Sequence, residues 1–287
     1  RLVFQPDFLQ KEIAGGNGMV AVNIMAVTQL YETYVKTACA AGVDAIISGA
    51  GLPTELPKFA EGYNVALAPI VSSTKSANVI LKFWDKKYHR TADFLVIEGP
   101  LAGGHLGFSK EQLEDIPSLD YDTEIQNIIA LKQTYEEKYQ TTIPVFVAGG
   151  MFTAKDAAHV MELGADGIQA ATRFVATEEC DASDAYKQAY VNASDEDVII
   201  IKSPVGMPGR AIKNAFIERM LAAPDKISHC FNCLKACNPA TAPYCITQAL
   251  INAVVGDLDN GLIFCGSRVG EITKITTVPK LMQELTV

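Results

Sequence analysis

The sequence predicts a parallel α/β protein of the (β/α)8-barrel type, the TIM barrel. Short, nearly continuous apolar runs alternate with amphipathic helical segments, as expected for parallel strands that are buried on both faces and joined by helices. Polar residues and glycines recur directly after these runs, at positions that converge on one rim of a barrel. No early Gly-x-Gly-x-x-Gly element follows a first strand, so the alternative of a dinucleotide-binding fold lacks its signature.

Six apolar runs of four to seven residues carry the strand signal. They are Met19–Met25, Asp44–Ile47, Val65–Ile70, Phe94–Ile97, Pro144–Val147 and Gly167–Ala170. A closed barrel needs eight strands. We therefore expect the first two βα units to precede Arg1, with Asp7–Ile13 as the end of the second helix; an open sheet is the alternative.

Between the runs, apolar residues recur at the spacing of a helix that packs one face against a sheet, for example within residues 30–41 and 125–135. Gly42 and Gly164 follow two of these segments, where glycine can take the left-handed conformation that ends a helix. Thr153 precedes a third segment and suits an N-cap. Helix boundaries are therefore predicted as well as strands.

The strand–helix rhythm breaks after Phe174. Beyond it, the pattern predicts one strand, one turn-rich loop and two helices. These are, in order, Val198–Lys202, Ser203–Arg210, Ala211–Leu221 and Ile246–Val255. We therefore predict a barrel at residues 1–180, holding strands 3 to 8, and a C-terminal cap on the substrate side at residues 181–287.

The composition is that of a soluble globular protein, with 49% hydrophobic and 20% charged residues. No apolar stretch is long enough to span a membrane and no segment has the pattern of a secretion signal, so we expect a cytoplasmic protein without a membrane partner. The net charge of −9 and the lack of a basic stripe argue against nucleic-acid binding.

Four of the seven cysteines lie close together, at Cys230, Cys233, Cys237 and Cys245. In a chain without a secretion signal, reduced thiols are expected rather than disulfides. Their number and spacing nearly suit zinc or an iron–sulfur cluster, but they match no standard motif and the loop is rich in turns. Structural thiols are therefore favoured, with a metal centre as the alternative.

Two successive strand ends predict a phosphate site. Pro144–Gly150 ends one strand, and Gly164–Thr172 contains the next. At barrel spacing, these ends bring backbone N–H groups and a helix N-terminus to one point. Gly149 and Gly150 let the backbone approach a ligand closely, and Thr172 adds a hydroxyl group.

A glycine-rich segment, Glu98–Gly107, follows the strand at Phe94–Ile97 and contains His105. A histidine framed by glycines is not packed as a core residue, and imidazole can act as a base near neutral pH. We predict that His105 is catalytic. The alternative is a loop histidine that only bonds a backbone carbonyl.

Five short elements are shared with a known group of flavoenzymes. They are Val22–Met25, Ser48–Gly51, Ala102–Gly107, Val147–Gly150 and Gly164–Phe174. Through them the chain, from about residue 19 to its end, resembles the nitronate monooxygenases, once called 2-nitropropane dioxygenases. The FMN-dependent enoyl-[acyl-carrier-protein] reductases of type II share the same elements. The Ala-Gly-Gly-His-x-Gly element is the most specific of the five.

The resemblance implies a TIM barrel that binds FMN, with His105 on the substrate side of the flavin. The residues implied to hold the phosphate are Gly149, Gly150, Ala171 and Thr172. Those implied to border the ribityl chain and the isoalloxazine ring are Asn23, Ser72, Ala102, Gly103 and Gln169. The family commonly has glycine where Ala171 stands, and its early Gly-Gly-Met contact with the flavin is absent here.

The implied reaction is the oxidation of an alkyl nitronate by oxygen to a carbonyl compound and nitrite. The alternative is reduction of an enoyl thioester with NAD(P)H. Both imply a small-molecule substrate, and a homodimer is compatible with either. A barrel that binds a phosphorylated ligand without redox chemistry is the remaining alternative.

Overall fold

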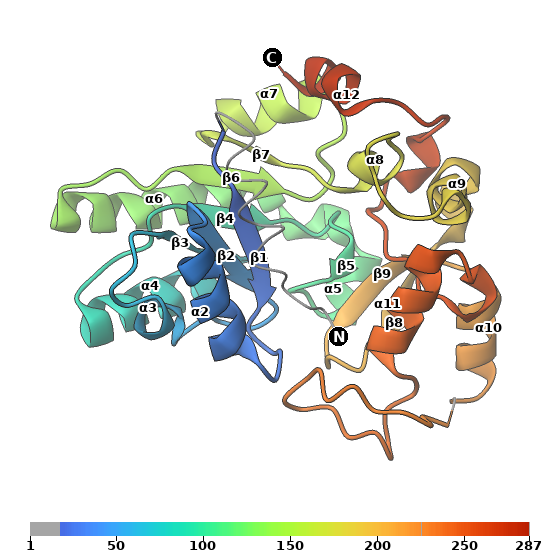
Figure 1. Cartoon of the computed structure of the whole chain (residues 1–287). Helices are drawn as coiled ribbons and strands as arrows, with labels where there is room; N and C mark the ends of the chain where they lie inside the picture. The colour runs from blue at the N-terminus through green and yellow to red at the C-terminus, as the bar shows by residue number, and fades with distance from the viewer. Residues whose placement is uncertain (1–17, 225, 287) are drawn as a thin grey trace.

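The computed structural model describes residues 18–224 and 226–286. Its centre is a six-stranded parallel sheet in the order β1-β2-β3-β4-β6-β7, so that each strand lies beside the next one in sequence (Figure 1). A doubly wound sheet would instead reverse its strand order at a switch point. The sheet curls into a half-barrel, which confirms the predicted fold class. The segment Asp7–Ile13, predicted as the end of a helix, lies outside the described residues.

The six strands coincide with the six predicted runs to within two residues at either end. They are β1 (Ala21–Met25), β2 (Ala45–Gly49), β3 (Ala66–Val71), β4 (Leu95–Glu98), β6 (Val145–Ala148) and β7 (Gly167–Gln169). Their register aligns the carboxyl ends, with Glu98 opposite Ala148 and Ala148 opposite Gln169. Residues that follow these strands therefore meet along one edge of the sheet.

Helices cover the convex face of the half-barrel (Figure 1). They are α2 (Tyr31–Ala41), α3 (Leu56–Phe59), α4 (Thr74–Tyr88), α6 (Tyr121–Tyr139) and α7 (Ala154–Glu162). Gly42 ends α2 with φ of 83°, and Thr153 caps α7 by accepting a hydrogen bond from the N–H of Asp156, as predicted. Gly164, also with positive φ, lies one residue beyond the C-cap of α7. The connection between β4 and α6 holds the short α5 (Lys110–Glu114) and η1 (Ile116–Leu119).

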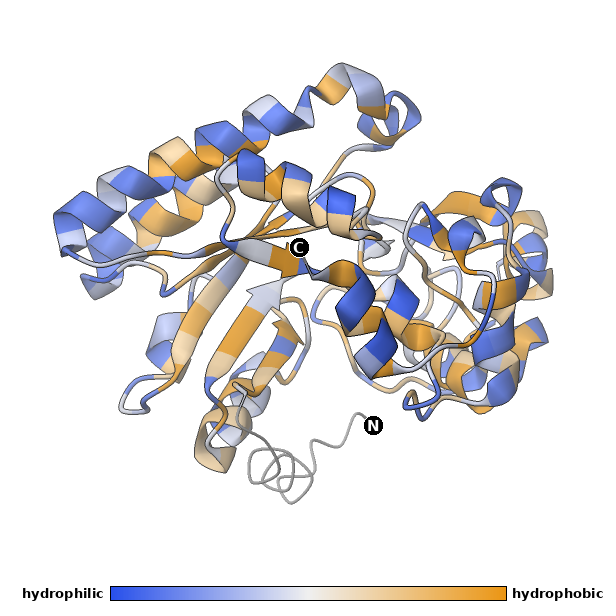
Figure 2. Ribbon diagram, turned by 90° about the horizontal axis from the view of Figure 1, so that it is seen from above, coloured by the Kyte–Doolittle hydropathy of each residue, from blue (hydrophilic) through white to orange (hydrophobic). Residues whose placement is uncertain are grey.

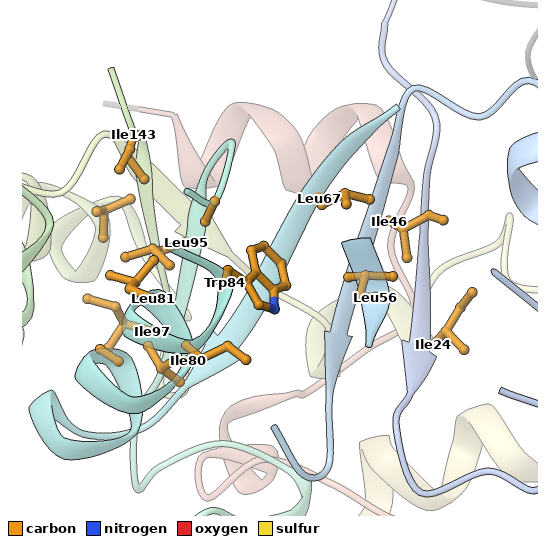
Figure 3. Packing of buried hydrophobic residues seen from close by; sticks show 14 of the residues in the cluster. Ile24, Ile46, Leu56, Leu67, Ile80, Leu81, Trp84, Leu95, Ile97 and Ile143 are labelled. Atoms are coloured by element: carbon orange, nitrogen blue, oxygen red, sulfur yellow. The ribbon is translucent and has the colours of Figure 1, made fainter. Parts of the chain in front are cut away.

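The core lies between these helices and the outward-facing strand residues (Figure 3). Trp84 of α4 is completely buried, and its indole N–H donates to the carbonyl of Pro53 at 3.1 Å. Ile46 and Leu67 are also fully buried. Burying an aliphatic side chain of this size stabilises a fold by about 1.5–3 kcal/mol.

Hydrophobic colours run along most of the strands (Figure 2), because the concave face of the sheet is apolar as well as the face that the helices cover. A cavity of about 720 Å³ is lined there by residues that include Ile47, Val96, Phe146 and Ile168. Leu285 of α12 (Val278–Leu285) closes part of it. This explains why the predicted runs are continuously apolar instead of alternating.

The C-terminal part adds a small antiparallel sheet in the order β5-β9-β8. Its elements, with those around it, are β5 (Gly104–His105), α8 (Thr172–Val175), α9 (Asp184–Asn192), η2 (Asp195–Asp197), β8 (Val198–Lys202), β9 (Pro208–Ile212), α10 (Ala215–Ala222), α11 (Ile246–Val255), η3 (Leu258–Asn260) and η4 (Val269–Glu271). The strand at Val198–Lys202 and the helix at Ile246–Val255 are confirmed.

Two predictions for this part are wrong at their boundaries. The predicted loop Ser203–Arg210 ends in β9, because Pro208–Arg210 pair with β8 and with the distant β5. The predicted helix from Ala211 begins only at Ala215, after Asn214 caps it with its side chain. Pairing between distant strands has overridden the local helical pattern.

Helix α12 is part of the predicted cap region in sequence, but it lies against α7 and α8 (Figure 1). Within residues 18–224 and 226–286, no helix combines the length and the apolar character that crossing a bilayer requires.

Candidate active site

A pocket of about 110 Å³ opens where β4, β6 and β7 end. It gathers seven of the nine predicted cofactor-binding residues. These are Ala102, Gly103, Gly149, Gly150, Gln169, Ala171 and Thr172. They come from three separate stretches of the chain, which the parallel register of the sheet brings together. We call this the strand-end pocket.

Close backbone approach shapes the strand-end pocket. Gly149 has φ of 91°, and a Cβ atom there would lie 2.8 Å from the carbonyl oxygen of Gly99. A Cβ atom on Gly103 would lie 2.5 Å from the carbonyl carbon of Cys265. Only glycine fits at either position without moving the neighbouring backbone. The walls therefore present peptide groups, with few side chains, to a ligand.

Residues 266–268 form one wall of the pocket, a place that no pattern in the sequence predicted. Gly266, Ser267 and Arg268 line the pocket. The N–H of Gly266 donates to the hydroxyl of Thr172 at 2.9 Å, and the N–H of Ser267 donates to the carbonyl of Leu101 at 3.2 Å. This leaves the Thr172 hydroxyl proton available as a donor.

Arg268 supplies positive charge at the pocket wall. Its guanidinium donates to the carbonyl of Gly150 at 3.1 Å and to Asp156 at 2.7 Å, and it forms a two-point ion pair with Glu271. The ion pairs with Glu271 and Asp156 raise the pKa of Arg268, so it stays charged. Its guanidinium also stacks 4.8 Å from the ring centroid of Phe152. These contacts fix the charge beside the glycine backbone.

Glu98, at the end of β4, is the acidic group of the pocket. Burial raises its pKa to about 7. The hydroxyl of Tyr121 donates to its backbone carbonyl at 2.8 Å, which fixes the strand end. The sequence placed Glu98 at a strand end, but the burial that changes its protonation depends on the tertiary packing. A carboxyl group that titrates near neutral pH is a candidate for a functional role.

His105 lies on β5, two residues after Gly103. Its Nε2 atom is hydrogen-bonded to the hydroxyl of Ser203 at 2.7 Å, and its ring packs edge-on against Phe264 with centroids 5.0 Å apart. Burial lowers the pKa of His105 to about 4, so the imidazole is neutral at pH 7. His105 is not among the residues that line the strand-end pocket. We call His105, Ser203 and Phe264 the histidine cluster.

Arg210 connects the cluster to the pocket. It lies on β9, is only 3% exposed, and donates from its guanidinium to the carbonyl of Ala102. Burial lowers its pKa. The backbone of Arg210 also pairs with Gly104 of β5 and accepts a hydrogen bond from the N–H of Cys265. The Arg210 side chain thus positions the segment 102–105, which contributes to both the strand-end pocket and the histidine cluster.

The other two predicted cofactor-binding residues lie outside the pocket. Ser72, after β3, donates from its hydroxyl to the carbonyl of Gly107 at 3.1 Å, which places it against the loop of His105. Asn23 is exposed on β1, an edge strand of the half-barrel. The structure therefore brings Ser72 near the histidine cluster and leaves Asn23 apart from both groups.

Comparison with known proteins decides the family of the chain. The family model described as nitronate monooxygenase matches residues 6–287. The chain belongs to the nitronate monooxygenase family. This membership confirms the resemblance that the five short elements indicated.

Curated members of the family match part of the chain. A probable nitronate monooxygenase of Staphylococcus saprophyticus is 32% identical over 135 residues, which are 47% of this chain and 36% of the relative. One from Staphylococcus aureus strain Newman is 30% identical over 128 residues, which are 45% of this chain and 34% of that relative. The matches thus span about a third of the length of these relatives.

Among solved structures, FabK from Thermotoga maritima is similar over 99% of this chain and 81% of its own, with a TM-score of 0.74 and 26% identity. Nitroalkane oxidase from Streptomyces ansochromogenes is similar over 98% of this chain and 84% of its own, with a TM-score of 0.66 and 18% identity. The enoyl reductase domain of MlnA from Bacillus amyloliquefaciens has a TM-score of 0.62 at 13% identity, over 97% of this chain and 85% of its own. The last two likenesses concern the fold alone.

Proposed function

We propose that this protein is an FMN-dependent oxidoreductase that uses oxygen to oxidise alkyl nitronates to a carbonyl compound and nitrite. The observation that carries the proposal is the strand-end pocket, in which glycine backbone and a fixed guanidinium surround a space at the ends of adjacent barrel strands. Membership of the nitronate monooxygenase family supports the choice of reaction.

The pocket suits a single phosphate group. Gly149 and Gly150 both have positive φ, and side chains at these positions would meet Gly99, Ala102 and Leu101. Peptide groups and a hydroxyl donor can hydrogen-bond phosphate oxygens at such strand ends. Arg268, which already pairs with Asp156 and Glu271, can add a charge-assisted hydrogen bond to a phosphate oxygen. This favours FMN, with one phosphate, over a dinucleotide.

In this proposal, Gly149, Gly150, Ala171 and Thr172 hold the phosphate, with Arg268 adding its charge. Ala102, Gly103 and Gln169 line the same pocket and border the rest of the flavin, whereas Ser72 and Asn23 lie outside the pocket and receive no contact with the flavin in this proposal. When bound, the flavin accepts electrons from the substrate, and the protein contributes orientation and electrostatics.

His105 acts on the substrate in two ways. Because burial keeps the imidazole neutral at pH 7, it can accept the proton of a neutral nitroalkane. The hydrogen bond with Ser203 fixes the ring, and with Nε2–H as donor it leaves Nδ1 as the proton acceptor. Once protonated, the imidazolium attracts the anionic nitronate, which removes the need for a separate counter-ion.

The second candidate function is NAD(P)H-dependent enoyl-[acyl-carrier-protein] reduction. The resemblance of Ala102–Gly107 to that enzyme group favours it, and the same fold occurs in an enoyl reductase domain. In this reaction, NAD(P)H is the electron donor and His105 orients or protonates the enoyl thioester. Because burial lowers the pKa of His105 to about 4, little of it is protonated at pH 7, which makes it a poor proton donor to an enoyl thioester.

Two parallel assays separate these reactions. Purified protein loaded with FMN is given an alkyl nitronate and oxygen, with nitrite release as the readout, and crotonyl thioester with NADH, with NADH consumption as the readout. The proposal predicts nitrite release that depends on enzyme and oxygen, and no thioester-dependent oxidation of NADH. Thioester-dependent NADH oxidation without nitrite release would establish the second function instead.

A further inference from the structure

The four clustered cysteines surround one cavity. Cys230, Cys233, Cys237 and Cys245 all line a pocket of about 110 Å³, separate from the strand-end pocket. The rest of its wall is mainly apolar, with Leu234 and Ile246 both buried. All seven cysteines of the chain are unpaired thiols in the structure. The thiols therefore converge on a space without being joined as disulfides.

The four thiols share one cavity wall that is otherwise mainly apolar. As neutral thiols they need no counter-charge, whereas four thiolates around one apolar cavity would repel each other unless a cation or cationic cluster joined them. Thiolate ligands at this place therefore require a bound metal centre.

The loop conformation supports ligation. Asn232 has φ of 50°, which turns the chain between Cys230 and Cys233. This turn directs the N–H of Asn232 to the sulfur of Cys230 at 3.3 Å. Backbone N–H groups that hydrogen-bond cysteine sulfur stabilise thiolates and tune the potential of iron–sulfur clusters.

The space suits several metal atoms rather than one. Tetrahedral zinc binds sulfur at about 2.3 Å, which holds the sulfur atoms about 3.8 Å apart. In the part of the chain that the structure describes, no group of three or more His, Cys, Asp or Glu side chains is placed so that it could hold a metal ion directly, so a bound group would have to fill the cavity between the sulfur atoms. A cavity of 110 Å³ is several times the roughly 10–15 Å³ that one water molecule needs. A cubane cluster separates its thiolates more widely than a single ion does.

The cysteine loop is also anchored to the barrel. The N–H of Gln29 donates to the carbonyl of Cys233 at 2.9 Å, and the N–H of Lys235 donates to the carbonyl of Val27 at 3.0 Å. The Lys235 ammonium donates to the carbonyl of Ala26 at 3.1 Å. These contacts hold the loop against the segment after β1, at the carboxyl edge of the sheet (Figure 1). Lys235 also places a positive charge on a loop whose thiolates would carry negative charge.

We propose that Cys230, Cys233, Cys237 and Cys245 are the ligands of a [4Fe–4S] cluster. Four thiolates complete the coordination of its four irons. Such a cluster would supply one-electron chemistry between its 2+ and 1+ states, with dithionite as the electron donor in the test below. The site is built from residues outside the strand-end pocket, so the proposal does not depend on flavin binding.

The test is anaerobic reconstitution of the full chain with Fe²⁺ and sulfide, followed by desalting. We expect about four iron atoms and four acid-labile sulfides per chain, and an electron paramagnetic resonance signal of the 1+ cluster after reduction with dithionite. Measuring iron, sulfide and zinc directly keeps the readout free of flavin absorbance. A folded wild-type chain that takes up no iron and sulfide would overturn the proposal, as would one that binds a single zinc ion.

Two variants show whether the cluster resides at this site. Cys233→Ser combined with Cys237→Ser should lose the bound iron and sulfide. Cys180→Ser, which changes a partly exposed cysteine outside the pocket, should retain both. Retention of iron by the double variant would mean adventitious iron only and would overturn the assignment. Circular dichroism of each variant confirms that the fold is intact.

Discussion

The strand-end pocket and the histidine cluster lie next to each other, but the first is formed mainly by backbone and the second by side chains. The pocket is made mostly of backbone, with glycines where a Cβ atom would meet Gly99 or Cys265. The histidine cluster is made of side chains, in which His105 depends on Ser203 and Phe264. One loop joins them, since Ala102 and Gly103 line the pocket and His105 follows two residues later.

This difference assigns separate tasks to the two parts. The peptide groups of the pocket do not titrate, whereas Glu98 in its lining, whose pKa burial raises to about 7, changes charge near neutral pH. The histidine cluster and Glu98 contain the groups that can move protons. Changes to the pocket should therefore alter cofactor affinity, whereas changes to the cluster should alter turnover with the cofactor still bound.

The largest expected effect concerns His105→Ala. A general base contributes about 10²–10⁴-fold to rate, so turnover of neutral nitroalkane should fall by that factor, whereas preformed nitronate should lose much less. Because burial lowers the pKa of His105 to about 4, the wild-type rate on nitroalkane should be lost only as pH falls through about 4. Steady-state rates on both substrate forms, with flavin content measured alongside, check this. Equal losses on both would show that His105 binds the anion.

Gly149→Ala should weaken flavin binding by roughly 10²-fold, since strain and steric overlap together cost a few kcal/mol. The new Cβ atom would lie 2.8 Å from the Gly99 carbonyl. Gly62→Ala is the matched control, because Gly62 has a similar φ of 85° but nothing within 4 Å of a Cβ atom. Flavin titration of both variants measures the difference. Equal flavin affinities of the two variants would show that Gly149 does not belong to the cofactor site.

Glu98→Gln should change how stability depends on pH, in the flavin-free protein. Burial raises the pKa of Glu98 from 4.5 to about 7, so the folded state binds the extra proton between these values. The unfolding free energy of the wild type should therefore fall as pH rises through this window, by about 2 kcal/mol more than that of the variant. Urea unfolding at pH 5 and pH 8 measures it, and parallel pH profiles would show that Glu98 ionises normally.

The smallest effect is expected for Ser203→Ala. Loss of the 2.7 Å hydrogen bond frees the His105 ring, and misplacement of a base should lower kcat on nitroalkane by about tenfold. KM and flavin content should stay near the wild-type values. Ser203→Thr, which keeps the hydroxyl group, should recover part of the rate. An unchanged kcat for the alanine variant would show that Phe264 alone positions the ring.

The strands and the pocket glycines were predictable because their signals are local. A short apolar run predicts a buried parallel strand, and a Gly-Gly pair directly after it predicts a backbone-lined turn. Thr153 likewise predicted the start of α7. Features formed by residues within one strand–turn–helix unit could therefore be predicted from the sequence.

The side-chain partners were not predictable because they come from distant positions. Ser203 bonds a histidine 98 residues earlier, and Arg268 bonds the carbonyl of a residue 118 positions before it. Both belong to stretches that the pattern described only as loop or left unassigned. The error at Pro208–Arg210 has the same cause, since β9 exists through its pairing with β5 and β8.

The central claim is that the strand-end pocket holds the single phosphate of FMN. The most direct measurement is the mass of the flavin released when the purified, flavin-loaded protein is denatured. The account predicts FMN in about one-to-one ratio with the chain, and a strongly reduced amount from Gly149→Ala but not from Gly62→Ala. Release of FAD, or a folded protein that binds no flavin when it is supplied, would contradict it.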